Sequence, residues 1–336
     1  MKNLAVYFTG VKKVEVREEK IPVIGEQEVL VRALSSVISS GTEMLFYYGF
    51  VSTETPMDEK IPLLTRHAEY PFKHGYAVVG KVIGRGEKVD PTWNDRLVFA
   101  FHPHESFFSA KPSDLIVIDN LEVEDAVFTA NMETAVNLIM DGRPVIGENV
   151  VVFGQGVVGL LTTSLLALIP IHRLVTIETH EKRRAMSIGS GAHASLDPGK
   201  LDVSEPTDHL FGGKKADLVY EITGNSEALE KAIQLTGFGG RVIIGSWYGT
   251  KKRKVKLSSH FHRHRIKLIS SQVSTLAPEF TGSWTKQRRL DITQEMIHRI
   301  RPSRLITHRI PVQEANKAYR LLEQKPDETV GVILTY

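Results

Sequence analysis

The pattern of apolar and polar positions changes near residue 126. Before that point, short runs rich in β-branched residues alternate with Gly, Pro and Asp, which predicts strands joined by turns. The predicted strands are Leu4–Phe8, Val14–Arg17, Glu28–Leu34, Ala77–Ile83, Arg96–Phe101 and Asp114–Val117. Residues 1–125 are therefore expected to form an all-β domain.

From residue 126 to 273, strand-like blocks alternate with amphipathic, helix-like segments. The strand-like blocks are VVVF, LVTIE, ADLVYEIT, RVIIG and IKLIS. Continuous apolar strands that alternate with helices are typical of a parallel sheet covered on both faces, so the predicted fold class is α/β. Residues 274–336 are mixed again, with helices predicted at Leu290–Arg299 and Glu314–Glu323, a strand at His308–Ile310 and a closing strand GVILTY.

Residues Asn149 to Ile171 carry no charge, and this stretch is about as long as a membrane-spanning helix. Three spaced glycines and Pro170 interrupt this stretch directly after VVVF. We therefore interpret it as a strand, a tight turn and a buried helix.

The turn has the spacing Gly154-x-Gly156-x-x-Gly159 between that strand and that helix, as a dinucleotide-binding loop requires. Gly154 permits the turn, Gly156 lets the backbone approach a pyrophosphate and Gly159 allows close helix packing. The amides of Val157 and Val158 would face the phosphates.

The next strand ends at Glu178, 19 residues past Gly159. A carboxylate there accepts hydrogen bonds from a ribose and repels a 2′-phosphate, which favours NAD over NADP. Lys182, Arg183 and Arg184 follow closely and leave NADP open.

Two further turns end predicted parallel strands, where the ligand crevice of such a sheet lies. Thr223-Gly224 is the candidate for the adenine side, and Ser246-Trp247 is the candidate for the nicotinamide side.

Composition narrows the possible functions. The 336 residues suggest two domains, and 42 Lys and Arg against 39 Asp and Glu give no reason to expect nucleic acid or a membrane as partner. The chain has no Cys, which excludes disulfides, thiolate metal sites and a Cys nucleophile. Its first residues lack the apolar region of a signal peptide, so a cytoplasmic location is expected.

The order of motifs resembles the medium-chain dehydrogenase/reductase superfamily over nearly the whole chain. The motifs are SGTE at 40–43, GYAVVGKV at 75–82, DRLV at 95–98, ETA at 133–135, the glycine motif, ITG at 222–224, GGRVIIG at 239–245 and EAxxAY at 314–319. The resemblance implies a GroES-like β-barrel domain beside a Rossmann domain, an active site in the cleft between them, Thr134 among the cofactor contacts, and a homodimer or homotetramer.

This sequence departs from the zinc-dependent members of that family. Their Cys, His and Cys metal ligands correspond to Ser40, Tyr76 and Ala130 here, and the four-Cys structural lobe is missing. The resemblance therefore implies a zinc-free branch, with a weaker similarity to bacteriochlorophyllide dehydrogenase-like members.

Without zinc, hydride transfer needs other groups to hold the developing alkoxide. Ser40, Thr42, Glu43 and Tyr76 occupy or adjoin the lost metal positions. We expect Tyr76 and Thr42 to donate hydrogen bonds to the substrate oxygen and Glu43 to orient them or relay a proton. The alternative is that Tyr76 is a packed aromatic residue and Thr42-Glu43 a turn or helix cap.

Three other features remain open. His102 and His104 share a face if extended, and with His74, Glu43 or Glu105 they would suit a metal. Contact with the substrate cleft is a second alternative, but Pro103 favours a solvent loop. The basic stretches 251–254 and 260–265 are expected to be solvated turns, with an anionic ligand as the alternative. Trp284, beside Arg288 and Arg289, is compatible with a cleft cover or an oligomer interface.

The sequence thus predicts an NAD(H)-dependent oxidoreductase that interconverts an alcohol and a carbonyl of a small molecule. Reduction of enones or quinones with NAD(P)H is the second interpretation. A non-catalytic dinucleotide-binding protein is the third.

Overall fold

The computed structural model describes residues 2–52, 54, 67–251 and 254–336. The chain forms two compact units. Unit 1 contains residues 1–130 and 297–336, and unit 2 contains residues 131–296. The first border lies close to the predicted one near 125, whereas unit 2 extends past the predicted border near 273.

Unit 1 contains the predicted strands and several elements that the apolar pattern did not indicate. Its strands are β1 (Asn3–Gly10), β2 (Lys13–Glu19), β3 (Val29–Val37), β4 (Phe72–Lys73), β5 (Val78–Arg85), β6 (Leu97–Ala100), β7 (Phe107–Ala110), β8 (Leu115–Val117), β15 (Ile306–Pro311) and β16 (Gly331–Thr335). Its helices are α1 (Ser40–Tyr47), α2 (Val123–Ala126) and α10 (Ala315–Gln324). Short 3₁₀ turns of the chain occur at Pro91–Trp93, Pro112–Asp114, Pro278–Phe280, Pro302–Leu305 and Val312–Glu314.

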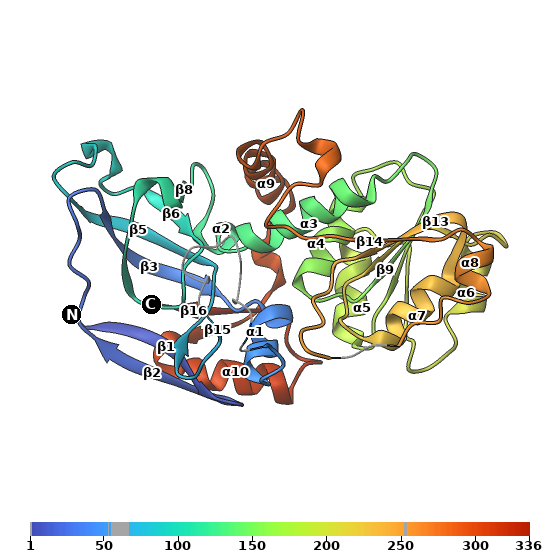
Figure 1. Cartoon of the computed structure of the whole chain (residues 1–336), viewed down its shortest axis with the longest axis horizontal. Coiled ribbons are helices and arrows are strands. Elements are labelled where there is room, and N and C mark those ends of the chain that lie inside the picture. Colours follow the sequence, from blue (N-terminus) through green and yellow to red (C-terminus); the bar gives the residue numbers. More distant parts are fainter. Residues whose placement is uncertain (1, 53, 55–66, 252–253) are drawn as a thin grey trace. The chain divides into compact units, whose positions relative to one another are not determined.

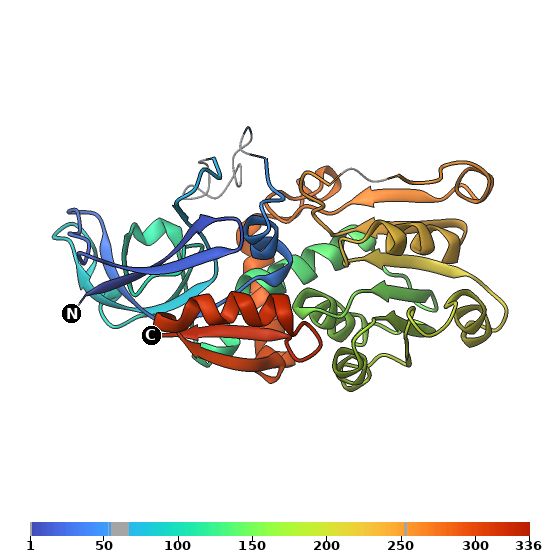
Figure 2. The ribbon, with the colours of Figure 1, turned by 90° about the horizontal axis from the view of Figure 1, so that it is seen from below.

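The larger sheet of unit 1 joins both ends of the chain. Its strand order is β15-β16-β3-β5-β6-β8, with β7 also paired to β3, and a second sheet has the order β2-β1-β4. β16 runs antiparallel to β3, with Ile333 opposite Val37. The closing apolar strand thus completes the sheet begun near the amino terminus, which explains why the β-rich pattern returns after unit 2. Figure 2 shows β16 with α10 and β15 in the red end of the colour scale.

Unit 2 contains a six-stranded parallel sheet (Figure 1). Its strands are β9 (Asn149–Phe153), β10 (Arg173–Ile177), β11 (Ala194–Leu196), β12 (Ala216–Glu221), β13 (Thr236–Ile244) and β14 (Lys267–Ser270). They lie in the order β11-β10-β9-β12-β13-β14, which is the doubly wound order of a Rossmann fold. The helices are α3 (Thr129–Gly142), α4 (Val157–Leu166), α5 (Glu181–Gly189), α6 (Ser204–Leu210), α7 (Ser226–Leu235), α8 (His260–Arg263) and α9 (Lys286–Ile300).

The central strand β9 is buried along its whole length, and it pairs with β10 on one side and β12 on the other. Burial on both faces accounts for its uninterrupted apolar sequence. β9, the glycine turn and α4 confirm the strand-turn-helix interpretation of this uncharged stretch. Within the described ranges, none of the helices has the length and apolar character needed to cross a bilayer.

A buried cation explains why unit 2 continues into α9. The Arg289 side chain is fully buried, and its Nη2 donates to Glu133 Oε1 of α3 at 2.8 Å. Its Nη1 donates to the Asn137 side chain at 2.6 Å, and the same guanidinium also contacts the carbonyls of Val273 and Thr275. These bonds hold the first part of α9 on α3.

We expect Arg289→Lys to destabilise unit 2 by about 2 kcal/mol. A lysine has three donors at a single nitrogen, so it leaves some of the buried acceptors around the guanidinium without a hydrogen bond. Urea unfolding followed by circular dichroism measures this change. The exposed Arg288, one position earlier, provides the matched Arg288→Lys control. Equal stability of both variants would contradict a structural role for the buried guanidinium.

Candidate functional site

The glycine turn of unit 2 has the local geometry of a phosphate-binding loop. Gly154 has a φ of +89°, a conformation that side chains rarely adopt. A Cβ on Gly159 would lie 2.0 Å from the Gly154 carbonyl oxygen, so only glycine lets α4 approach the loop this closely. At Gly156, by contrast, a Cβ would have no heavy atom of a more distant residue within 4 Å, its two chain neighbours aside. The loop therefore leaves room beside Gly156, where α4 begins with Val157 and Val158.

Glu178 is fixed against this loop. Its side chain is buried, and Oε2 accepts a hydrogen bond from the Gln155 backbone amide at 2.7 Å. Oε1 accepts from the His180 amide at 2.9 Å and from the Thr179 hydroxyl at 3.2 Å. A negative charge thus stands at the end of β10 and beside the glycine turn, where a Rossmann fold places its ribose-binding acid.

The basic residues after Glu178 lie on α5. Arg184 donates to the carbonyls of Glu178 and Thr179 at 2.9 and 2.7 Å and forms an ion pair with Asp197 at 3.0 Å. Its guanidinium is therefore engaged in holding this turn. Arg183, the candidate for the cofactor site, is half-buried on the same helix.

A buried carboxylate that the sequence analysis missed joins the two other predicted turns. Glu221, the last residue of β12, accepts from the Thr223 amide at 2.7 Å and from the Tyr248 hydroxyl at 2.6 Å. Ser246 Oγ accepts from the Gly224 amide at 2.7 Å. The turns 223–224 and 246–248 thus lie together, at the carboxyl ends of neighbouring strands. The signal for Glu221 was an acidic residue that ends the apolar strand ADLVYE.

The remaining cofactor candidates occupy different environments. Trp247 is 46% exposed in the turn after β13. Thr134 is half-buried on α3.

In unit 1, three hydroxyl groups gather at the start of α1. The Tyr76 hydroxyl donates to Ser39 Oγ and lies 3.3 Å from Thr42 Oγ1. We call Ser39, Thr42 and Tyr76 the hydroxyl cluster. Ser39, the residue before α1, supplies a hydroxyl that the sequence analysis assigned to neighbouring Ser40, which is half-buried in the first turn.

Glu43 contacts the Ser39 backbone of the hydroxyl cluster and is fully buried. Its Oε1 accepts from the Ser39 amide at 2.8 Å, and its Oε2 accepts from the Tyr319 hydroxyl at 2.6 Å and lies 3.1 Å from His104 Nε2. Burial acts to raise the pKa of the Glu43 carboxyl, but His104, His74 and the Tyr319 hydrogen bond together lower it. Burial, with Glu43 beside it, raises the pKa of Tyr319 well above its usual value. Both oxygens of Glu43 thus have partners, which favours an orienting role over proton relay.

His102 and His104 are both buried, so the prediction of a solvent loop is wrong. The His102 ring stacks on Phe108 with centroids 4.0 Å apart and lies 3.5 Å from Glu105, whereas His104 faces Glu43. The two rings therefore contact different carboxylates, Glu105 for His102 and Glu43 for His104. Among the described residues, the His, Asp and Glu side chains form no group of three or more that suits a metal ion.

Zinc does not fit the family positions by donor chemistry. Ser40, Tyr76 and Ala130 offer no thiolate or imidazole, which are the usual zinc ligands. We therefore derive no step through a metal.

The basic stretch at 260–265 forms α8 and the turn that follows it, between β13 and β14 as expected. The His260 ring Nε2 lies 3.0 Å from the Thr236 carbonyl. Lys252 and Arg253 of the other basic stretch lie outside the described residues. The Trp284 ring lies below the Arg288 guanidinium, 4.1 Å from it, so these two residues pack locally.

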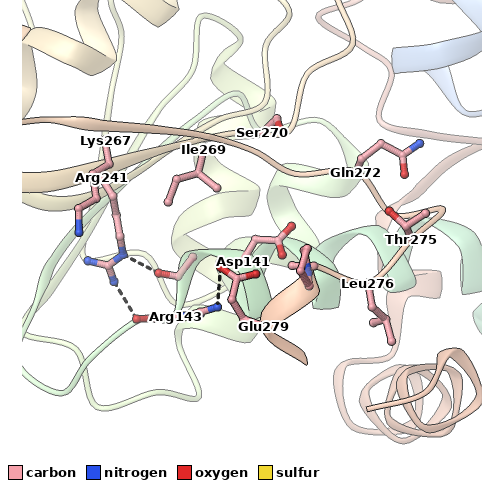
Figure 3. A pocket seen from close by; sticks show the side chains of 13 residues that line it. Asp141, Arg143, Arg241, Lys267, Ile269, Ser270, Gln272, Thr275, Leu276 and Glu279 are labelled. Carbon is pink, nitrogen blue, oxygen red and sulfur yellow. Dashed lines mark hydrogen bonds and ion pairs between the residues drawn. The ribbon is translucent and has the colours of Figure 1, made fainter. Parts of the chain in front are cut away.

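An open pocket of about 590 Å³ lies elsewhere in unit 2 (Figure 3). Asp141, Arg143, Arg241, Lys267 and Glu279 are among its lining residues. Its charges are largely matched, because Arg143 pairs with Glu279 at 3.3 Å and Arg241 pairs with Glu148 at 2.7 Å. No residue of the glycine turn and none of the turns at 223–224 and 246–247 lines it. We therefore do not assign it to the candidate site.

Comparison with known proteins agrees with a dinucleotide-binding fold in unit 2. The family model "zinc-binding dehydrogenase" matches residues 157–286, which belong to unit 2. A zinc-type alcohol dehydrogenase-like protein of Escherichia coli K12, YphC, is 26% identical over 95% of both chains.

Two solved structures share the fold. An alcohol dehydrogenase from E. coli CFT073 in complex with NADH has a TM-score of 0.79 at 18% identity and covers 100% of this chain and 99% of its own. A protein from Sinorhizobium meliloti 1021 with bound NADP has a TM-score of 0.80 at 18% identity, with complete coverage of both chains.

These similarities indicate a dehydrogenase fold with two domains, one GroES-like and one of the Rossmann type. The family model and the relative YphC both agree with the resemblance to the medium-chain dehydrogenase/reductase superfamily. The predicted fold and the predicted enzyme class, an NAD(P)-dependent oxidoreductase, are thereby confirmed.

Proposed function

We propose that the protein interconverts an alcohol and a carbonyl group of a small molecule by hydride transfer, with NAD(H) as cofactor and without zinc. The observation that carries the proposal is the glycine turn with the Glu178 carboxylate bonded to its Gln155 amide. NAD(H), when bound, supplies or accepts the hydride. YphC is zinc-type by name, but the family model matches only residues 157–286, which include none of the family zinc positions at 40, 76 and 130.

The residues of unit 2 bind and orient in this proposal. The amides of Val157 and Val158 face the pyrophosphate beside Gly156, and the free space at Gly156 supports this role. Glu178 accepts hydrogen bonds from the ribose hydroxyls. Glu221 holds the turns at Gly224 and Ser246 in place, so that Trp247 presents its ring.

The hydroxyl cluster of unit 1 binds the substrate oxygen. Tyr76 and Thr42 donate hydrogen bonds to the oxygen on which negative charge develops, which lowers the barrier to hydride addition. The Tyr76 hydroxyl then gives its proton to this oxygen and takes up a proton from water in its place. Glu43 keeps the cluster in place through the Ser39 amide. We further propose a homodimer or homotetramer, as is common in the superfamily.

Glu178→Gln is expected to weaken NADH binding about tenfold, because a charge-assisted hydrogen bond to the ribose becomes a neutral one. The same change removes the repulsion of a 2′-phosphate and brings the affinities for NADH and NADPH closer together. Fluorescence titration with both cofactors measures the two affinities. The exposed Glu181→Gln on α5 is the control. An unchanged ratio of affinities would exclude Glu178 as the residue that selects the cofactor.

The first experiment combines metal analysis with NADH and NADPH titration of untagged protein. Metal-free protein that binds NADH tightly would support the proposal, whereas stoichiometric zinc required for turnover would overturn its zinc-free part. A screen with 4-deuterated NADH then separates the functions. Stereospecific deuterium transfer to carbonyls supports the proposal, transfer only to enones or quinones supports their reduction instead, and binding without any transfer indicates a non-catalytic protein.

A further inference from the structure

His104 contacts both segments of unit 1 that carry the hydroxyl cluster. It is fully buried, and no role follows for it from the hydride-transfer chemistry itself. Its ring has two partners: Nε2 lies 3.1 Å from Glu43 Oε2, and Nδ1 lies 2.8 Å from Ser36 Oγ. Ser36 Oγ in turn lies 2.9 Å from the Tyr336 hydroxyl. The imidazole is therefore held at both nitrogens.

The first connection runs through Glu43 to the start of α1. The carboxylate bonded to His104 uses its other oxygen to accept from the Ser39 amide at 2.8 Å. Ser39 is also the residue whose hydroxyl accepts from Tyr76. A displaced Glu43 would thus release the backbone that presents Ser39 and, three residues later, Thr42.

The second connection runs through Gly75 to Tyr76. Gly75 has a φ of +104°, and a Cβ there would lie 2.5 Å from His104 Cδ2. The imidazole therefore packs directly on the backbone that precedes Tyr76. The His104 amide also donates to the His74 carbonyl at 3.1 Å, which fixes the two segments side by side.

We propose that His104 is a positioning residue that keeps the two halves of the hydroxyl cluster next to each other. It holds Ser39 and Thr42 through Glu43, and it holds Tyr76 through Gly75. This inference rests on the proposed function in assigning substrate binding to the cluster. The geometric part of the inference is that His104 fixes the Tyr76 hydroxyl against Ser39. This part does not depend on the proposed function and is tested separately.

Activity tests the inference through three variants. His104→Leu removes both polar contacts, and a misplaced cluster is expected to lower kcat about 100-fold with little change in the KM for NADH. His104→Gln keeps a donor for Glu43 and an acceptor for Ser36, and it is expected to recover most of that loss. His102→Leu is the matched control, because this second buried histidine stacks on Phe108 and is expected to leave kcat unchanged. Equal losses of kcat in His104→Gln and His104→Leu would overturn the inference.

A spectroscopic readout tests the geometry without a substrate. With 3-fluorotyrosine at position 76, His104→Leu is expected to shift or broaden the ¹⁹F resonance, whereas His104→Gln and His102→Leu are expected to preserve it. If His104→Leu does not fold, Ser36→Ala, which frees Nδ1, is expected to shift the resonance instead. An unmoved resonance in the folded variant overturns the inference. A moved resonance in a protein that transfers no hydride would overturn the proposed function alone.

Discussion

Gly156→Val is expected to weaken NADH binding about 1000-fold, or ~4.1 kcal/mol, while the protein remains as stable as the wild type. Apart from Gly156 itself and its two chain neighbours, no heavy atom lies within 4 Å of the position that a Cβ would take, and the residue has a φ of −69° that valine adopts without strain. The added methyl groups therefore occupy the space that the pyrophosphate needs. Fluorescence titration with NADH and thermal unfolding measure the two parts of this prediction.

Gly159→Val provides the contrast within the same motif. A Cβ there would lie 2.0 Å from the Gly154 carbonyl oxygen, so this variant is expected to lose stability even without a ligand. The two glycines thus separate a ligand requirement from a packing requirement. Wild-type affinity for NADH in Gly156→Val would place the dinucleotide away from this loop and remove the main support for the proposed function.

The sequence predicted unit 2 well because its signals are local. A buried parallel strand has to be apolar throughout, and a tight turn into a closely packed helix needs glycine at fixed spacing. β9, Gly154, Gly159 and α4 meet both conditions within 18 residues. Glu178 was found for the same reason, since its position follows from the end of the next strand.

The polar interior of unit 1 was harder to predict because its partners are distant in the chain. Glu43, His104 and Tyr319 meet only after the β-rich segment and the carboxy-terminal return have folded together. Nothing in the local pattern around Pro103 indicates that both neighbouring histidines are buried. The motif SGTE drew attention to Ser40, but the N-terminal geometry of α1 selects Ser39, whose amide bonds to Glu43.

Tyr76 is the residue that best tests the proposed site. The sequence identified it only as the residue at a family metal position, whereas the structure gives it two hydroxyl neighbours. A tyrosine in a merely structural role would need its ring, which packs against the apolar cluster of unit 1. A catalytic donor would need its hydroxyl.

Tyr76→Phe is therefore expected to lower kcat roughly 100- to 1000-fold, as the loss of one preorganised donor does in other enzymes. The KM for NADH should change little, because the cofactor residues belong to unit 2. Tyr70→Phe is the matched control: the Tyr70 hydroxyl donates to the Phe46 carbonyl at 2.7 Å, so its loss costs about 1 kcal/mol of stability without lowering kcat. Steady-state kinetics on a carbonyl substrate from the deuterium screen measures both variants. A wild-type kcat in Tyr76→Phe would show that the ring alone is required, and the substrate oxygen would then need another donor.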